Sequence, residues 1–269
     1  MLKTFEPSDP VLHSTGFMEA EVQYNLVHFI AGQPNSHKLK SSGDDLVYVH
    51  SEGYNPWLWI SPELGLLQKK ALVQQLAEKV KDQELTGVTG GPEPAKLFAE
   101  AYCRLTGKLY HPRMMMEAYH CPQAVQPAGV SGYLLQAGEI HIPLISEYVA
   151  AFVRDAFGTE TPPESHLPYA RSLAEAGSLH LWVVEDTPVS MANLAHMSAR
   201  HVRINEVFTP QEHRKHGYAS AAVAELCAQM LGRGITPMLY ADAANPDSNK
   251  VYQSVGFVNA GTVADLRFQ

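Results

Sequence analysis

The sequence predicts an α+β fold in which a mixed, largely antiparallel sheet is flanked by helices and is preceded by an α/β half. Helix and strand patterns alternate along the chain, three strands follow one another in the second half, and no short-period repeat occurs. A loose segment at 120–132 contains two prolines and two glycines. We therefore expect two domains, 1–125 and 126–269.

The composition is that of a globular protein with a surplus of acid. Hydrophobic residues make up 45% of the 269 and charged residues 18%, which excludes a disordered, collagen-like or disulfide-rich chain. Lys and Arg number 20 against 28 Asp and Glu, a net charge of −8. A general nucleic-acid binder needs a basic face, so no nucleic-acid partner is expected.

Cysteine and histidine usage predicts neither a disulfide framework nor a metal site. The three cysteines are widely spaced and form no C-x-x-C pair, and the thirteen histidines include no H-E-x-x-H and no third ligand at useful spacing. The N-terminus has acids and prolines where a secretion signal needs an apolar core, and no later stretch is apolar for long enough to span a bilayer. We expect a cytoplasmic protein without metal or membrane partner.

The first half predicts helices and strands in alternation. A helix is expected from about Ser14 to Ile30, where apolar residues share one face. Ser61 resembles an N-cap that opens a second helix. Segment 87–92 is expected to be a turn; a vestigial anion loop is disfavoured because no Arg or Lys stands at its entrance. The other expected elements are strands at 46–50, 57–61 and 114–116 and a helix at 94–106 that Gly107 ends.

The second half predicts three consecutive strands with helices before and after them. A strand at 133–137 and a helical stripe of apolar residues at 144–153 come first, and a short helix over 167–176 ends at Gly177. The three strands are expected at 179–185, 189–197 and 201–208, followed by a helix, a strand at 238–242, a short helix and a final strand.

Large apolar side chains in both halves are assigned to packing. Trp57, Trp59 and Trp182 could line a substrate pocket, but they bury so much area that core or interface packing is favoured. The run Met114 to Met116 is expected in a strand core.

The stretch 204–220 is the most informative about function, because it passes from a strand through a polar loop to a helix. A helix N-terminus offers unpaired N–H groups and a partial positive charge, which stabilise a phosphate. Gly217 removes a side chain where a phosphate would approach the backbone, and Ala219 keeps the next contact small. Arg214 and Lys215 add charge at the entrance. The stretch predicts an anion cradle, with a solvated loop and a packing glycine as the alternative.

A second informative stretch, 239–257, follows. Asn245 precedes a proline and marks a helix start, while Asn249 and Tyr252 are three residues apart and share a face of that helix. Gly256 can end the helix.

Together the two stretches resemble the GNAT superfamily of acyl-CoA-dependent N-acyltransferases. Arg214, Gly217 and Ala219 match its R/Q-x-x-G-x-G/A signature, and 245–257 matches its N-x-x-S/A-x-x-x-Y-x-x-x-G-F segment. The resemblance covers about 131–269. Through its glycine-bearing segment and the helix after it, the first half resembles the degenerate GNAT domain of bacterial two-part GNAT proteins.

The resemblance implies that acetyl-CoA is the co-substrate and that backbone groups of the matching segment bind it. The strand before the loop is expected to splay from its neighbour and to pair with the pantetheine arm through Val207, Phe208 and Thr209. Backbone N–H groups of the loop and of the first helical turn would hold the pyrophosphate; they belong to Arg214, Lys215, His216, Gly217, Tyr218, Ala219 and Ser220. Lys215 stands where the family frequently has glycine, a change we expect to be tolerated because the contact is through the backbone.

The resemblance also implies roles for side chains. Asn245 and Asn249 would contact the pantetheine, and Tyr252 would act as general acid beside the thioester sulfur. Purely structural roles are the alternatives: an N-cap for Asn245 and a packed ring for Tyr252.

The chemistry of acyl transfer supports these residue types. Amine attack on a thioester forms an oxyanion that a fixed N–H donor stabilises, and it expels a thiolate that a phenol can protonate. The amine must be neutral, so a base is needed, and Glu206, Glu185 and Asp242 stand near strand ends. We predict Glu206 and Tyr252 as the catalytic residues.

The expected function is transfer of an acetyl group from acetyl-CoA to a primary amine of a small molecule by direct attack, in a monomer or homodimer. The acidic surface favours a cationic acceptor. Two rival hypotheses remain open: a non-catalytic acyl-CoA sensor or interaction module, and a protein lysine or N-terminal acetyltransferase with a shallow, open groove.

Overall fold

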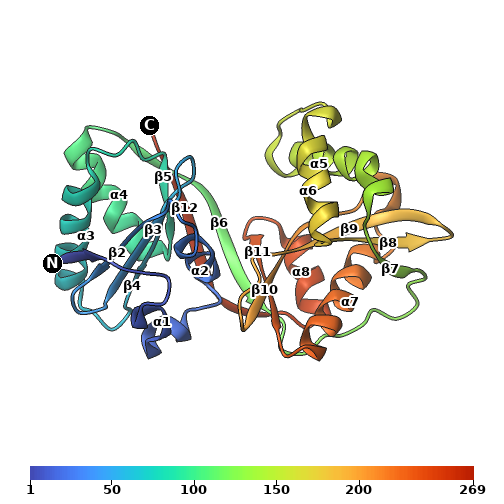
Figure 1. The fold of residues 1–269 in the computed structure, drawn as a ribbon, viewed down its shortest axis with the longest axis horizontal. Helices are drawn as coiled ribbons and strands as arrows, with labels where there is room; N and C mark the ends of the chain where they lie inside the picture. The colour runs from blue at the N-terminus through green and yellow to red at the C-terminus, as the bar shows by residue number, and fades with distance from the viewer. The chain divides into compact units, whose positions relative to one another are not determined.

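The computed structural model describes residues 1–269, which separate into two compact units (Figure 1). The units differ from the predicted domains 1–125 and 126–269, because two segments from the end of the chain pack into the first unit. Unit 1 contains Met1–Tyr119, Tyr240–Pro246 and Asn259–Gln269, and unit 2 contains His120–Leu239 and Asp247–Val258. None of the helices combines the length and the apolar character that a bilayer span requires.

Unit 1 is built on a mixed sheet with strand order β1-β2-β3-β4-β5-β12-β6. Strands β4 and β5 are parallel, whereas β1 to β4 and the β5–β12 pair are antiparallel. The strands are β1 (Leu2–Thr4), β2 (His37–Ser41), β3 (Leu46–His50), β4 (Trp57–Ile60), β5 (Gly87–Gly90), β6 (Tyr110–His120) and β12 (Val258–Phe268). The predicted Met-rich strand is the middle of β6.

The helices of unit 1 cover both faces of this sheet, and the period of two along the strands decides which side chain meets which helix. Leu46 and Tyr48 pack in the core beneath α3 and α4, and Val47 and Val49 pack in the core beneath α1 and α2. Trp57 and Trp59 lie in the second core, as predicted. The helices are α1 (Thr15–Glu19), α2 (Asn25–Ala31), α3 (Leu66–Val80) and α4 (Pro92–Thr106), and a 3₁₀ turn, η1, covers Pro10–His13.

The predicted helix from Ser14 to Ile30 is wrong, since two short helices, α1 and α2, occupy this stretch. Ser14 does cap the first helix, and its hydroxyl accepts the N–H of Phe17 at 3.4 Å. Between the helices, the Gln23 side chain donates to the Thr262 carbonyl at 2.5 Å, and the Tyr24 hydroxyl accepts the Gly91 N–H at 2.8 Å. These long-range contacts break the helix.

The predicted start of α3 at Ser61 is also wrong. The Ser61 N–H donates to the Asp45 carbonyl at 2.8 Å, which keeps this residue at the end of the β3–β4 pair. The helix begins at Leu66 with Gly65 as its N-cap, and the Gly65 N–H donates to the Gln68 side chain at 3.0 Å.

Segment 87–92 is strand β5 and the start of α4, where a turn was predicted. Its glycines are needed because neighbouring backbone lies very close. A Cβ on Gly87 would lie 2.1 Å from the Leu266 carbonyl oxygen on β12, and one on Gly90 would lie 2.3 Å from the Leu58 carbonyl oxygen on β4. Gly107 ends α4 in a left-handed conformation with φ of 73°, as predicted.

Unit 2 is built on a sheet with strand order β11-β10-β9-β8-β7, in which β10 and β11 are parallel and the other pairs antiparallel. The predicted α+β class is confirmed, and each predicted element of this half is present. The strands are β7 (Tyr133–Gln136), β8 (Leu179–Val184), β9 (Thr187–Ala195), β10 (His201–Phe208) and β11 (Thr236–Asp242).

Helices cover both faces of this sheet as well. Leu179, Leu181 and Val183 pack beneath α5 and α6, while Trp182, 7% exposed, lies in the core beneath α7. The helices are α5 (Ile142–Phe157), α6 (Leu167–Ala176), α7 (Tyr218–Gly232) and α8 (Pro246–Val255), with 3₁₀ turns η2 (Glu139–His141), η3 (Pro163–His166) and η4 (Gln211–His213). Gly177 ends α6 with φ of 61°, as predicted.

Candidate functional site

The parallel pair β10–β11 separates part-way along its length. Register pairs join His201–Arg203 of β10 to Thr236–Met238 of β11, and β10 then continues to Phe208 beside β9 alone. This is the splay expected of the strand before the loop. The Phe208 and Thr209 carbonyls are hydrogen-bonded within the protein, by the Ser190 hydroxyl at 2.9 Å and by Arg214 Nε at 2.9 Å.

A β-bulge lies at the free end of β10. Asn205 pairs with Asn193 and Phe208 with Met191, so two residues of β10 oppose one residue of β9. The first of the two, Glu206, has a left-handed backbone with φ of 51°. Such bulges re-aim a side chain, and a non-glycine residue held in this region is strained by roughly 1–2 kcal/mol. The bulge therefore fixes where the Glu206 carboxyl points.

The loop between β10 and α7 ends in a backbone that exposes N–H groups. Lys215 and Gly217 both have positive φ, 65° and 80°. The Ala221 N–H donates to the Gly217 carbonyl at 2.9 Å as the first bond of the helix, so the N–H groups of 218–220 precede the intrahelical ladder. A Cβ on Gly217 would lie 3.0 Å from Val130 Cγ2. The predicted anion cradle thus has suitable backbone geometry.

Arg214 braces this loop. Its Nε donates to the Thr209 carbonyl, its Nη2 lies 2.5 Å from Asp155 Oδ2 at the end of α5, and its guanidinium lies 5.8 Å from the centre of the Phe208 ring. Arg214 holds the pKa of the Asp155 carboxyl below its ordinary value. Because Asp155 partly balances its charge, Arg214 contributes to the cradle mainly by holding the loop.

The other loop side chains face solvent. Lys215 and His216 are exposed, and the His216 ring stacks on the Tyr218 ring at 5.4 Å between centroids. Lys215 is therefore the cation of the loop that remains available to an anion. Its positive φ also explains why glycine suits this position in the family that the sequence resembles.

We expect Lys215→Gly to stabilise the protein by about 1 kcal/mol, because glycine relieves the left-handed strain. Lys215→Ala is the matched control, since it removes the charge and keeps the strain. Thermal melts of both variants check this prediction, and a glycine variant no more stable than the alanine variant would contradict it.

The Glu206 carboxyl is largely withdrawn from solvent. Oε1 accepts a short hydrogen bond from the Tyr169 hydroxyl on α6, and Oε2 is buried without a hydrogen-bond partner. Burial raises the pKa of Glu206, against the lowering effects of the Tyr169 hydrogen bond and the Arg203 charge. A carboxyl with a raised pKa and an unused oxygen suits a proton acceptor.

The other two candidate bases are Glu185, in a turn, and Asp242, the last residue of β11. Glu185 is exposed in the β8–β9 turn, where Glu185 and Asp186 both have positive φ. Asp242 Oδ1 accepts the Ala244 N–H at 2.9 Å, a turn-forming contact.

Helix α8 holds the predicted tyrosine. Burial raises the pKa of Tyr252 to about 12, and its ring packs edge-on against Phe257 at 5.8 Å. Asn249 is half-buried on the same helix, and Asn245 is exposed directly before Pro246, the first residue of α8. The catalytic and pantetheine roles of these residues stay predictions.

Two candidate functional residues were not predicted from the sequence. Tyr169 and Asp155 lie on α6 and α5, 37 and 59 residues from the side chains they contact, Glu206 and Arg214. No local pattern marks such pairs. The structure has no group of three or more His, Cys, Asp or Glu side chains that could hold a metal ion, and its three cysteines are free thiols.

Unit 1 contains a helix crossover of the same kind, β4-α3-β5, between parallel strands. At its helix N-terminus the Gly65 N–H already donates to Gln68, and Glu63 precedes it in sequence. Lys69 is paired with Glu93 at 2.6 Å. The N–H groups of 66–68 precede the intrahelical ladder, because the first helical bond runs from the Lys69 N–H to the Gly65 carbonyl at 3.0 Å. The two crossovers therefore differ in the residues beside the helix N-terminus, with Glu63 and a paired Lys69 in unit 1 and Arg214 and Lys215 in unit 2.

Residues 145–257 match the model of the acetyltransferase (GNAT) family. The chain contains a GNAT domain. The match includes the splayed strand, the loop with Gly217, α7 and α8. No curated protein matches the chain in a sequence search.

Solved structures extend the GNAT fold over both units. A GCN5-related N-acetyltransferase from Sphaerobacter thermophilus matches with a TM-score of 0.61 at 15% identity, over 100% of this chain and 95% of that chain. A GNAT-family acetyltransferase from Colwellia psychrerythraea matches with a TM-score of 0.57 at 15% identity, over 100% of this chain and 98% of that chain. A tandem GNAT protein from the clavulanic acid biosynthesis pathway matches with a TM-score of 0.54 at 12% identity, over 100% of this chain and 98% of that chain. The predicted two-part GNAT architecture is confirmed.

Proposed function

We propose that unit 2 transfers an acetyl group from acetyl-CoA to a primary amine of a small molecule. The observation that carries the proposal is the Gly217 cradle, in which unpaired N–H groups open the helix after a splayed strand. Charge-assisted hydrogen bonds from such groups suit a pyrophosphate. The GNAT domain supports acyl transfer as the general activity.

The residues that would hold acetyl-CoA fit an extended, anionic ligand. Of the predicted backbone N–H groups, those of 215–220 would bind the pyrophosphate, whereas the Arg214 N–H already donates to the Gln211 carbonyl at 3.3 Å. Lys215 would add charge, and the open side of β10 at Val207 would pair with the pantetheine. The bound co-substrate supplies an activated thioester carbonyl. Asn249 would contact the pantetheine from α8, and Asn245 would do so from the residue before it.

The chain's own groups would then move two protons. Glu206 would accept a proton from the acceptor ammonium at its unpartnered Oε2, leaving a neutral amine to attack the carbonyl. The Tyr252 hydroxyl would donate toward the departing sulfur, and its pKa of about 12 keeps it protonated at neutral pH. An acceptor that enters as a cation also matches the net charge of −8.

A calorimetric titration with acetyl-CoA tests the cradle. We expect Gly217→Ala to weaken binding by roughly tenfold or more, because an added methyl group obstructs at least one charge-assisted contact. Gly234→Ala is a matched control: Gly234 has φ of 74° beyond the other end of α7, and a Cβ there would meet nothing within 4 Å. Equal binding by both variants would contradict the placement of the pyrophosphate.

Turnover separates this proposal from its two rivals. A non-catalytic acyl-CoA sensor would bind acetyl-CoA with the same dependence on Gly217 but would acetylate no member of a panel of small primary amines. A protein acetyltransferase would acetylate a lysine or an N-terminus in peptides in preference to free amines.

A further inference from the structure

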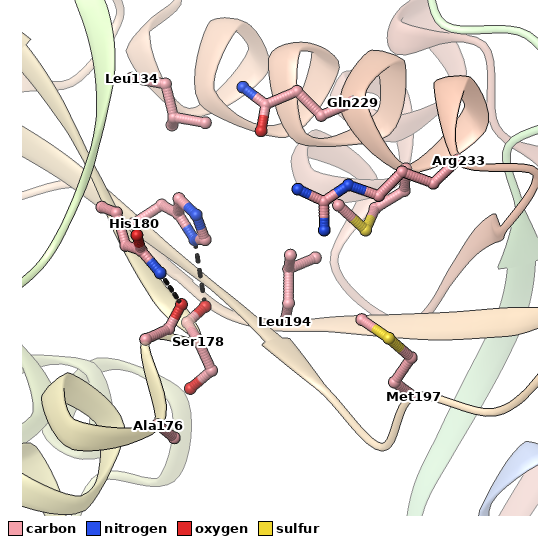
Figure 2. A pocket seen from close by; sticks show the side chains of 11 residues that line it. Leu134, Ala176, Ser178, His180, Leu194, Met197, Gln229 and Arg233 are labelled. Carbon is pink, nitrogen blue, oxygen red and sulfur yellow. Dashed lines mark hydrogen bonds between the residues drawn. The ribbon is translucent and has the colours of Figure 1, made fainter.

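Unit 2 contains a cavity of about 380 Å³ at the far end of α7 from the Gly217 cradle (Figure 2). Since α7 spans Tyr218–Gly232, the cavity lies roughly 20 Å along the helix from the cradle. It is lined by Leu134, Gln136, Ala176, Gly177, Ser178, His180, Leu194, Met197, Gln229, Met230 and Arg233. None of these residues belongs to the proposed acetyl-CoA or proton-transfer groups.

Two backbone carbonyls at one side of this cavity already accept hydrogen bonds. The Gly177 carbonyl accepts the Gln136 side chain at 2.7 Å. The Ser178 carbonyl accepts the Leu194 N–H at 2.9 Å and lies 3.1 Å from His180 Nδ1. Because Nδ1 faces a carbonyl, it carries the proton, and the other ring nitrogen remains for a ligand. The two backbone carbonyls of this wall therefore have little unused capacity to bind a donor, and His180 Nε2 is the acceptor that remains.

The cavity also contains one cation that is not paired with an acidic side chain. Arg233 is the only charged residue that lines the cavity, and its guanidinium takes part in no ion pair. Figure 2 shows this side chain projecting from the end of α7 into the cavity, on the side that faces His180. A guanidinium presents its donors in a planar fork that matches a carboxylate.

The rest of the lining combines apolar side chains with the polar residues Gln136, Ser178, His180 and Gln229. Leu134, Leu194, Met197 and Met230 contribute hydrocarbon and thioether surface, and no acidic side chain is present to repel an anion. Small-ligand sites commonly combine such walls with a few fixed polar groups, in volumes of roughly 300–1,000 Å³.

We propose that this cavity binds a small monocarboxylate with an apolar body, whose carboxylate pairs with Arg233 and whose body lies against the leucine and methionine side chains. The site is separate from the proposed acetyl-transfer site. A single guanidinium beside leucine and methionine side chains matches one negative charge better than it matches a phosphate, which needs more donors.

The test uses three probes of one shape: 3-phenylpropionate, its neutral amide and 3-phenylpropylamine. Calorimetry or NMR titration of the intact chain is expected to show that the carboxylate binds at least tenfold more tightly than either analogue. The same loss is expected for the carboxylate with Arg233→Gln. Arg171→Gln, which removes a cation exposed on α6 outside the cavity, is expected to bind as wild type does.

The ring of His180 provides a second readout. Burial and the Arg233 charge lower the pKa of His180, so a carboxylate bound beside Arg233 is expected to raise it. NMR titration of the ring with and without 3-phenylpropionate measures this shift. The probe is also added to Gly217→Ala, where binding is expected to be unchanged.

Three results would overturn the proposal. They are equal binding of the amide, undiminished binding by Arg233→Gln in a protein that melts as wild type does, and loss of binding in Gly217→Ala. The last would place the probe at the cradle. The proposed acetyl transfer is tested separately by acetyl-CoA binding and turnover, so either proposal can fail alone.

Discussion

Glu206→Gln is expected to lower turnover by about 10² to 10⁴, because it removes the proton acceptor while leaving the cofactor groups in place. The amide keeps the shape of the carboxyl and can still accept the Tyr169 hydroxyl. Acetyl-CoA affinity, measured by calorimetry, should therefore stay at the wild-type value. An unchanged turnover would show that another group or water accepts the proton.

The pH dependence of this reaction gives a sharper signature. The base must be ionised, so kcat/KM rises with pH through the raised pKa of Glu206. The Tyr169 hydrogen bond lowers that pKa, so Tyr169→Phe should shift the acid limb toward higher pH. A structural role for Tyr169 alone would lower activity without moving the limb.

Stability provides the matched control for Glu206. Its pKa is higher in the folded protein than in the unfolded chain, so ionisation favours the unfolded chain as pH rises through this range. Glu206→Gln removes that effect, so its melting temperature relative to wild type should rise as the pH increases above the ordinary pKa of a glutamate. A variant that loses activity while it gains relative stability has lost a functional group, not a structural one.

The second large effect is expected for Tyr252→Phe, which should lower turnover by about 10² or more with acetyl-CoA binding unchanged. The ring can still pack against Phe257, so the helix should keep its fold. Because the pKa of Tyr252 is about 12, its ionisation cannot cause an alkaline limb in kcat/KM below about pH 11.

The size of the Tyr252 effect also distinguishes two roles. A single hydrogen bond to the developing thiolate is worth about 1.5–3 kcal/mol, or roughly ten- to hundredfold in rate. A larger loss would require proton transfer in the transition state, and unchanged turnover would leave Tyr252 as a packed ring.

Features set by neighbouring residues could be predicted from the sequence. Gly107 and Gly177 end helices because a left-handed residue is needed there, and that need is visible locally. The cradle was predictable for the same reason, since Gly217 and the helix after it lie within one short stretch. The order of the strands 179–208 followed from their short spacing.

Features set by distant residues could not be predicted. The glycines of β5 are dictated by Leu266 and Leu58, which lie far away in the chain, so their pattern resembled a turn. Likewise, the pKa of Glu206 depends on its burial and on Tyr169, neither of which its sequence neighbours indicate. A left-handed glutamate in a bulge also follows from sheet pairing, which local propensity does not contain.

The position of β12 has a consequence for the order in which the chain is completed. This strand lies between β5 and β6 in unit 1, yet its residues from Asn259 onward are synthesised after every residue of unit 2. Until β12 is synthesised, the edges of β5 and β6 that it will cover stay unpaired, and such edges are prone to intermolecular pairing. Truncation after Val258 would leave that vulnerability permanent while sparing the residues of unit 2.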